Sequence, residues 1–194
     1  MAPRTKFSKE QIIDSAFFIA KSEGIDRITI RKVAAHLGSS SAPIYVNFND
    51  VEELKQAVIN KIVELSQRMI KEQNTGNPFA DIGIASLKMA TEYPVLIRDF
   101  VLKPNEYLKE YDQEMGGNFT ELMKQDPELK GFTDDELMTI LLKMRIFQTG
   151  LTLMVANGLL PKEFDLDKML ELSDSVAGDI VLGTRSRKEE RKRN

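Results

Sequence analysis

Apolar residues recur along this sequence in steps of three and four, the spacing that places side chains on one face of an α-helix. The pattern is most regular over 50–72, where the apolar residues are Val51, Leu54, Val58, Ile62, Leu65 and Met69. No segment alternates apolar and polar residues over a useful length, as a half-buried strand does. The sequence therefore predicts an all-α fold.

Capping residues mark where these helices begin. Ser8 with Gln11 is typical of a capping box, Thr29 can cap a short second helix, and Pro43 fits the first turn of a third helix over 41–47. Asp50 starts the next helix, and more helices are predicted over 78–91, 94–101, 104–115, 118–125, 133–156 and 166–183. We expect a three-helix head in residues 1–50, with helix 50–72 as connector, and a larger helical body in residues 51–194.

The composition excludes several classes of protein. The 194 residues include no Cys and one His, which excludes disulfides, a thiol nucleophile and a multi-histidine metal site. His36 is expected to be a surface residue rather than a ligand. A Gly-rich phosphate loop, a nucleophile elbow and a carboxylate–histidine metal set are all missing from the sequence, so we expect neither an enzyme nor a cofactor. No apolar run approaches about 18 residues and no signal peptide opens the chain, which predicts a cytoplasmic protein without a membrane partner.

The net charge of −3 is unevenly distributed. Residues 1–50 carry seven Lys and Arg against five acidic residues, whereas residues 51–184 are strongly acidic. The last ten residues, RSRKEERKRN, are basic again, and we interpret them as a solvated, mobile end. A mildly basic head on an acidic body is typical of a DNA-binding module joined to a part that need not touch DNA.

Residues 30–48, IRKVAAHLGSSSAPIYVNF, match a helix-turn-helix. The small side chain of Ala34 lets two helices cross closely, and Gly38 can adopt the positive φ of the turn. Leu37, Ile44 and Phe48 are expected in the core. Small polar residues at the start of the following helix would let its backbone approach base edges and phosphates.

Residues 12–54 resemble the DNA-binding region of the tetracycline-repressor (TetR) family. The segments IIDSAFFIAKSEG, TIRKVAAHLG and PIYVNFNDVEEL occur in the order and at the spacing of that family. The second carries its Thr-x-x-x-(Ile/Val)-Ala pattern from Thr29 to Ala34, and the third its apolar-Tyr-x-x-Phe pattern from Ile44 to Phe48. The length and the all-α remainder fit the family as well.

The resemblance implies a set of DNA contacts. Tyr45 would give its hydroxyl to a phosphate, the alternative being a core tyrosine, and Asn47 would pair with adenine, the alternative being a solvated helix end. Family members commonly carry a lysine where Val51 stands, so this phosphate contact is lost or moves to Lys55; Ser39 and Ser41 also depart from the pattern. The predicted DNA-binding residues are Thr29, Arg31, Ser40, Ser41, Ala42, Pro43, Tyr45, Asn47 and Lys55, with Arg4 and Lys6 as a possible arm.

The body is rich in Met and aromatic residues, which can line an adaptable apolar cavity or simply form its core. Arg98 would suit an anionic ligand group, or a surface salt bridge. The predicted ligand-binding residues are Met89, Phe100, Tyr107, Tyr111, Met115, Phe119, Met144 and Phe147. We expect a small, largely apolar effector here.

The helix near 133–158 carries apolar residues on two faces, more than one protomer can cover. We therefore expect a homodimer through the helices near 133–158 and 166–183, bound to double-stranded DNA at a palindromic operator. The resulting hypothesis is a ligand-responsive repressor. The alternative is a helical scaffold whose helix-turn-helix binds another protein, and DNA binding discriminates between the two.

Overall fold

The computed structural model describes residues 7–102 and 120–193, and all regular structure in this part of the chain is helical. The predicted all-α fold is confirmed. By packing, the chain divides into a first unit that ends at Pro104 and a second unit that begins at Asn105. The boundary predicted at residue 50 separates functions rather than packing units and stays a prediction.

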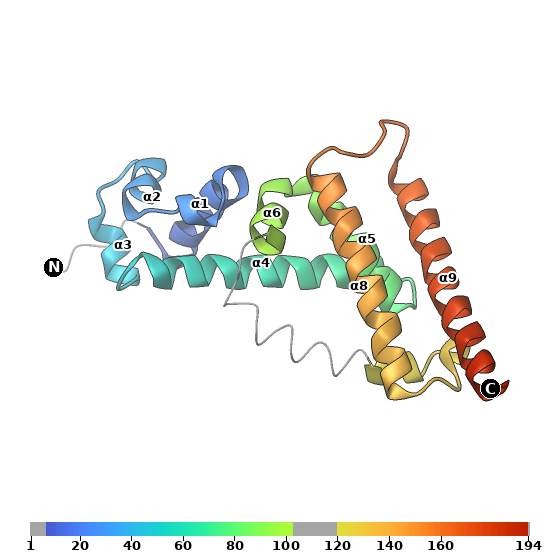
Figure 1. The fold of residues 1–194 in the computed structure, drawn as a ribbon. Coiled ribbons are helices and arrows are strands. Elements are labelled where there is room, and N and C mark those ends of the chain that lie inside the picture. The colour runs from blue at the N-terminus through green and yellow to red at the C-terminus, as the bar shows by residue number, and fades with distance from the viewer. Residues whose placement is uncertain (1–6, 103–119, 194) are drawn as a thin grey trace. The chain divides into compact units, whose positions relative to one another are not determined.

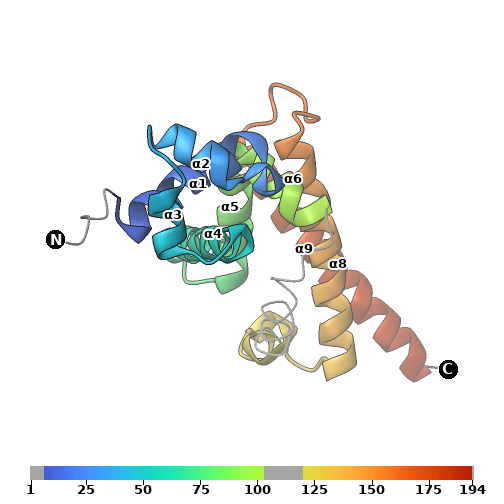
Figure 2. The same cartoon turned by 90° about the vertical axis from the view of Figure 1, so that its left-hand side faces the viewer.

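The first unit contains the three short helices and the connector. Its elements are α1 (Lys9–Glu23), η1 (Ile25–Arg27), α2 (Ile30–His36), α3 (Ala42–Asn47), α4 (Val51–Gln73), α5 (Pro78–Glu92) and α6 (Pro94–Leu102). Figure 1 shows α1, α2 and α3 gathered over the N-terminal half of α4, with α6 beside α1. The view in Figure 2 looks along α4 and shows the same grouping.

The caps occur where the sequence predicts them. Ser8 and Gln11 form the capping box of α1, and Asn77 accepts hydrogen bonds from two backbone N–H groups at the start of α5. Asp50 caps α4, but the Glu53 carboxylate accepts from the N–H of Asn49 rather than from that of Asp50. These local bonds satisfy N–H groups that a helix leaves unpaired at its start.

One apolar core runs through the first unit. It includes fully buried residues of α1, α2, α3 and α4, namely Ile12, Val33, Ile44, Leu54 and Val58, and continues to Met89 and Leu96. Phe48 is buried as predicted, and Leu37 packs against the same core as a partly buried residue. The head therefore has no core of its own that is separate from α4, α5 and α6.

A carboxylate from α6 closes the turn after α1. The N–H of Ile25 donates to Asp99 Oδ2 at 2.8 Å, across 74 positions of sequence. Gly24 precedes it with φ of 103°, and a Cβ there would lie 2.6 Å from the same oxygen. Both the backbone conformation and the close approach require glycine at this position.

The second unit contains η3 (Pro127–Leu129), α8 (Asp134–Ala156) and α9 (Leu166–Arg193), with a further helical segment over 120–124. Thr133 and Glu136 form the predicted capping box of α8. The two long helices pack side by side and run in opposite directions (Figures 1 and 2). The helix predicted over 104–115 lies outside the described residues.

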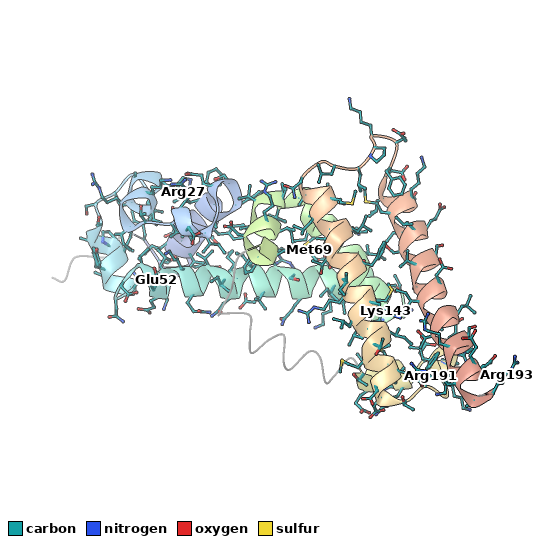
Figure 3. All side chains as sticks on the ribbon, viewed as in Figure 1. Arg27, Glu52, Met69, Lys143, Arg191 and Arg193 are labelled. Atoms are coloured by element: carbon teal, nitrogen blue, oxygen red, sulfur yellow. The ribbon has the colours of Figure 1, made fainter. Side chains whose placement is uncertain are left out.

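The last helix is longer than the sequence analysis predicted. It continues through the basic segment to Arg193 instead of ending near residue 183. Arg185 donates to the carbonyl of Glu128 and lies over the ring of Phe132, and Lys188 donates to the carbonyl of Gly131. These long-range partners hold the basic segment against the loop before α8, so the interpretation of a mobile end was wrong for this part. The terminal Arg191 and Arg193 remain exposed (Figure 3).

Lys188 also forms an ion pair with Glu136, with 2.6 Å between Nζ and Oε2. Both side chains are about four-fifths covered. The Lys188 ammonium, helped by the Thr133 N–H, holds the pKa of the Glu136 carboxyl below its usual value.

Candidate nucleic-acid interface

The helix-turn-helix begins at Thr29, whose hydroxyl oxygen accepts a hydrogen bond from the N–H of Lys32. At the end of α2, Gly38 adopts φ of 60° and donates to the carbonyl of Ala35, while Ser39 donates to that of Ala34. This pair of bonds is a Schellman ending, which reverses the chain within a few residues. The predicted role of Gly38 in the turn is confirmed.

The inner face of α3 is fixed by Ile44 and Phe48, which expose 0% and 2% of their surfaces. Pro43 lies in the first turn of the helix, as predicted. The N–H of Phe48 donates to the carbonyl of Ile44 and ends the helix. With one face held in the core, the other residues of this short helix point away from it.

Most of the predicted DNA-binding residues lie on the outer side of α3 and at its start. Tyr45 exposes 59% of its surface, so the alternative of a core tyrosine is wrong, and Ser40 and Ala42 are also exposed. Ser41, Pro43 and Asn47 are half-buried. The amide Nδ2 of Asn47 donates to the carbonyl of Pro43 at 2.8 Å, within the same helix.

The predicted phosphate ligands differ in their surroundings. Arg31 is exposed in the first turn of α2 and forms no ion pair within the described residues, so its guanidinium is free to bind an anion. Lys55 exposes 17% of its side chain and donates to Glu52 at 2.8 Å. Glu52 therefore already neutralises the charge predicted to replace a lysine at Val51. Arg4 and Lys6 lie outside the described residues.

The sequence analysis missed Val46, which is the most exposed apolar residue of the first unit at 69%. It lies between Tyr45 and Asn47 on α3. In a sequence, an isolated valine near Ile44 and Phe48 looks like a core residue. Its distance of two positions from Ile44, which turns it to the opposite side of a helix, is the signal that was available.

His36 is exposed at the end of α2, as predicted, and its Nδ1 lies 2.8 Å from the hydroxyl of Ser15. Its ring stacks on Phe18 with 4.8 Å between the centroids. No group of acidic residues and His that could hold a metal ion occurs within residues 7–102 and 120–193.

The predicted ligand-binding residues fall in both units. Met89 is buried in the core of the first unit and Phe100 packs against that core, whereas Met144 and Phe147 are half-buried on α8 in the second unit. Tyr107, Tyr111, Met115 and Phe119 lie outside the described residues. The grouping of these side chains around one ligand stays a prediction.

The first unit has an open groove of about 650 Å³ between α4 and α5. Its lining is mostly charged and polar: Leu65, Arg68, Met69, Glu72, Gln73, Lys88 and Glu92. None of the predicted ligand-binding residues lines it. Met69, labelled in Figure 3, is one of its few apolar walls.

On α8, the two predicted apolar faces are separated by burial. Leu137, Ile140 and Leu151 are buried. The other face is exposed along the helix: its apolar residues are Met138, Leu142, Ile146 and Met154, with exposed fractions of 40% to 65%. Within the described ranges, α8 is the one helix whose length and apolar composition would suffice to cross a membrane. Its middle carries Lys143, labelled in Figure 3, and Arg145, two charges that are costly in a bilayer.

Comparisons with known proteins give one weak sequence relative and several structural ones. No protein-family model matches the sequence. An uncharacterised HTH-type transcriptional regulator of Mycobacterium tuberculosis is 29% identical over 93 residues. That match covers 48% of this chain and 41% of the relative, so it spans less than half of either protein.

The solved structures match over almost the whole chain. A transcriptional regulator from Rhodococcus superimposes with a TM-score of 0.66 and 17% identity, over 91% of this chain and 97% of that one. SmeT, the repressor of the Stenotrophomonas maltophilia multidrug efflux pump SmeDEF, gives 0.63 and 16% over 89% of each chain. The ketosteroid regulator KstR2 of M. tuberculosis gives 0.56 and 13%, over 92% of this chain and 95% of that one. This chain has the fold of TetR-type transcriptional regulators.

Proposed function

We propose that this chain is a transcriptional repressor of the TetR family that binds a palindromic DNA operator as a homodimer and is released by a small, largely apolar molecule. The observation that carries DNA binding is α3. This helix follows a Schellman turn, is fixed by Ile44 and Phe48, and turns Ala42 and Tyr45 outward next to an unpaired Arg31. A short helix held in this way is what a helix-turn-helix inserts into the major groove.

The proposed contacts follow the exposure of each side chain. Tyr45, Thr29 and Arg31 anchor phosphates, and Ser40, Ser41, Ala42, Pro43 and Asn47 face the groove. Asn47 keeps its carbonyl oxygen and one amide hydrogen for a base. Because Lys55 is paired with Glu52, its contribution to phosphate binding is the smallest of the set.

The homodimer is supported by the exposed apolar residues of α8, and by Leu172 and Leu182, which expose 37% and 66% on α9. Gly150 lies on the same exposed side of α8 and would let a second helix approach closely. One recognition helix covers only a few base pairs, so two copies on a palindromic site are needed for useful specificity.

The release by a ligand is supported by the way α3 is attached. Only Phe48, Asn49 and Asp50 separate α3 from α4, and α4 runs without a break to Gln73. A tilt of α4 therefore moves α3 and changes the distance between the two copies in a dimer. A ligand bound within residues 78–155 that favours the tilted state weakens DNA binding by the same coupling free energy, ~1–3 kcal/mol.

Binding to DNA that flanks the gene, measured by gel shift, tests the proposal. Tyr45→Phe and Asn47→Ala should each weaken binding by ~1–3 kcal/mol, and only Asn47→Ala should relax sequence preference. If both variants bind as tightly as the wild type, the assignment of α3 to the groove is wrong. If the protein binds no DNA but retains another protein, the scaffold function is correct instead.

Titration with small apolar compounds tests release. An effector should bind free protein more tightly than DNA-bound protein, and Phe147→Trp should alter its effect while leaving the dimer intact. Tyr111→Trp is expected to act in the same way. A compound that binds both forms with equal affinity would show that the pocket exists but does not switch the protein.

A further inference from the structure

The centre of the outward face of α3 is apolar. Successive side chains of an α-helix are turned by about 100°, so Val46, two positions after Ile44, lies roughly opposite that buried residue. Ala42 precedes Val46 by four positions and therefore shares its side of the helix. Both side chains are exposed, and Val46 exposes more of its surface than Tyr45 does.

The polar groups of α3 lie around this centre. Tyr45 is turned to one flank and Pro43 to the other, while Ser40 and Ser41 precede the helix. Asn47 is nearer to the core side, is half-buried, and spends one amide hydrogen on the carbonyl of Pro43. The part of the helix that would enter the groove first thus presents methyl groups, with hydrogen-bonding groups at its edges.

Base edges in the major groove offer one apolar group, the C5-methyl of thymine. We infer that Val46, together with Ala42, is a specificity-determining residue that contacts thymine methyl groups in each half-site. The inference rests on the proposed function and adds the chemistry by which the operator is recognised. It also assigns a purpose to an exposed valine that the fold itself does not need.

Uracil pairs as thymine does and lacks only the C5-methyl group, so it isolates this contact. The full-length protein first selects duplexes from a random pool, and each thymine of the best-bound duplex is then replaced by uracil, one at a time. We expect one or two positions in each half-site at which uracil lowers affinity about four-fold, the value for one buried methyl group. The same positions should respond little in Val46→Ala, because the contact is already lost.

Two further variants serve as matched controls. Val46→Thr keeps the shape and one methyl group, and is expected to retain part of the uracil effect. Tyr45→Phe removes a hydroxyl at the edge of the helix and should weaken all duplexes while leaving the uracil effect at full size. Val46 is exposed, so Val46→Ala should melt at the wild-type temperature.

The outcomes separate this inference from the proposed function. If selected duplexes bind tightly but uracil changes nothing, or changes Val46→Ala as much as the wild type, the thymine contact is wrong and DNA binding stands. If no duplex is enriched, or if Val46→Glu abolishes the capture of a protein partner instead, both the inference and the proposed function are overturned.

Discussion

In the first unit, Ile12, Ile44 and Leu54 are completely buried, whereas Leu142 and Ile146 of α8 expose more than half of their surfaces. Both regions are helical, and both draw on the same apolar residue types. The difference is in the number of elements that cover each helix. α1 is packed against α2, α3, α4 and α6, while α8 packs mainly against α9.

This comparison indicates which part is complete within one chain. The first unit buries its apolar residues by itself and leaves a few exposed side chains on α1 and α3. The pair α8–α9 leaves a continuous apolar face, which soluble proteins rarely expose unless a partner covers it. A second copy of the same pair would cover it with an isologous interface of about 2,000 Å² or more, the size of obligate dimers.

The largest expected effect is on the second unit. Ile146→Glu places a charge in the centre of the proposed interface, once from each copy. We expect the dimer to dissociate roughly 1,000-fold more readily, because an unpaired buried carboxylate costs several kcal/mol. Sedimentation equilibrium at micromolar concentration measures the change.

Phe18→Glu is the matched control for that variant, because Phe18 on α1 exposes 56% of its surface in the first unit. We expect this variant to remain a dimer. A wild-type protein that sediments as a stable monomer would show that the exposed face of α8 has another purpose.

A smaller effect is expected where α6 meets the turn after α1. Gly24→Ala combines a strained φ with a clash against Asp99, and should lower the free energy of unfolding by about 2–4 kcal/mol in urea. Gly76→Ala is its matched control, since Gly76 has φ of 85° and nothing within 4 Å of a Cβ. That variant should lose only about 1 kcal/mol, the cost of the backbone conformation alone. Equal losses in the two variants would mean that Asp99 does not hold the turn closely.

The smallest expected effect concerns Glu136, whose pKa is lowered in the folded state. A lowered pKa stabilises the fold above the unfolded value of about 4.3, and this contribution is lost as pH falls through the folded value. Lys188→Met should therefore be less stable than the wild type by about 0.5–1 kcal/mol at pH 7, with the difference closing between about pH 5 and pH 3. Urea unfolding across this range measures it at one protein concentration, with Lys192→Met as a control that shows no such closing.

The sequence predicted the features that depend on neighbours along the chain. The caps at Ser8, Thr29 and Asn77 and the turn at Gly38 involve partners within a few residues, and each lies where it was predicted. The extension of α9 depends on Phe132 and on carbonyls more than fifty positions away, which no local pattern reveals.

The candidate site shows the same limit. The side of α3 that faces the core was predicted from Ile44 and Phe48. The pairing of Lys55 with Glu52 and the bond within the helix made by Asn47 depend on rotamers, which the sequence does not specify. Val46 was overlooked because apolar residues are usually assigned to the core before their side of the helix is considered.

The most direct test of this account is the sequence of the duplexes that the wild-type protein selects from a random pool. Two first units joined through α8 and α9 predict an inverted repeat, with two half-sites related by a two-fold axis and at least two chains bound to each duplex. A single unrepeated motif bound by one chain would contradict the account.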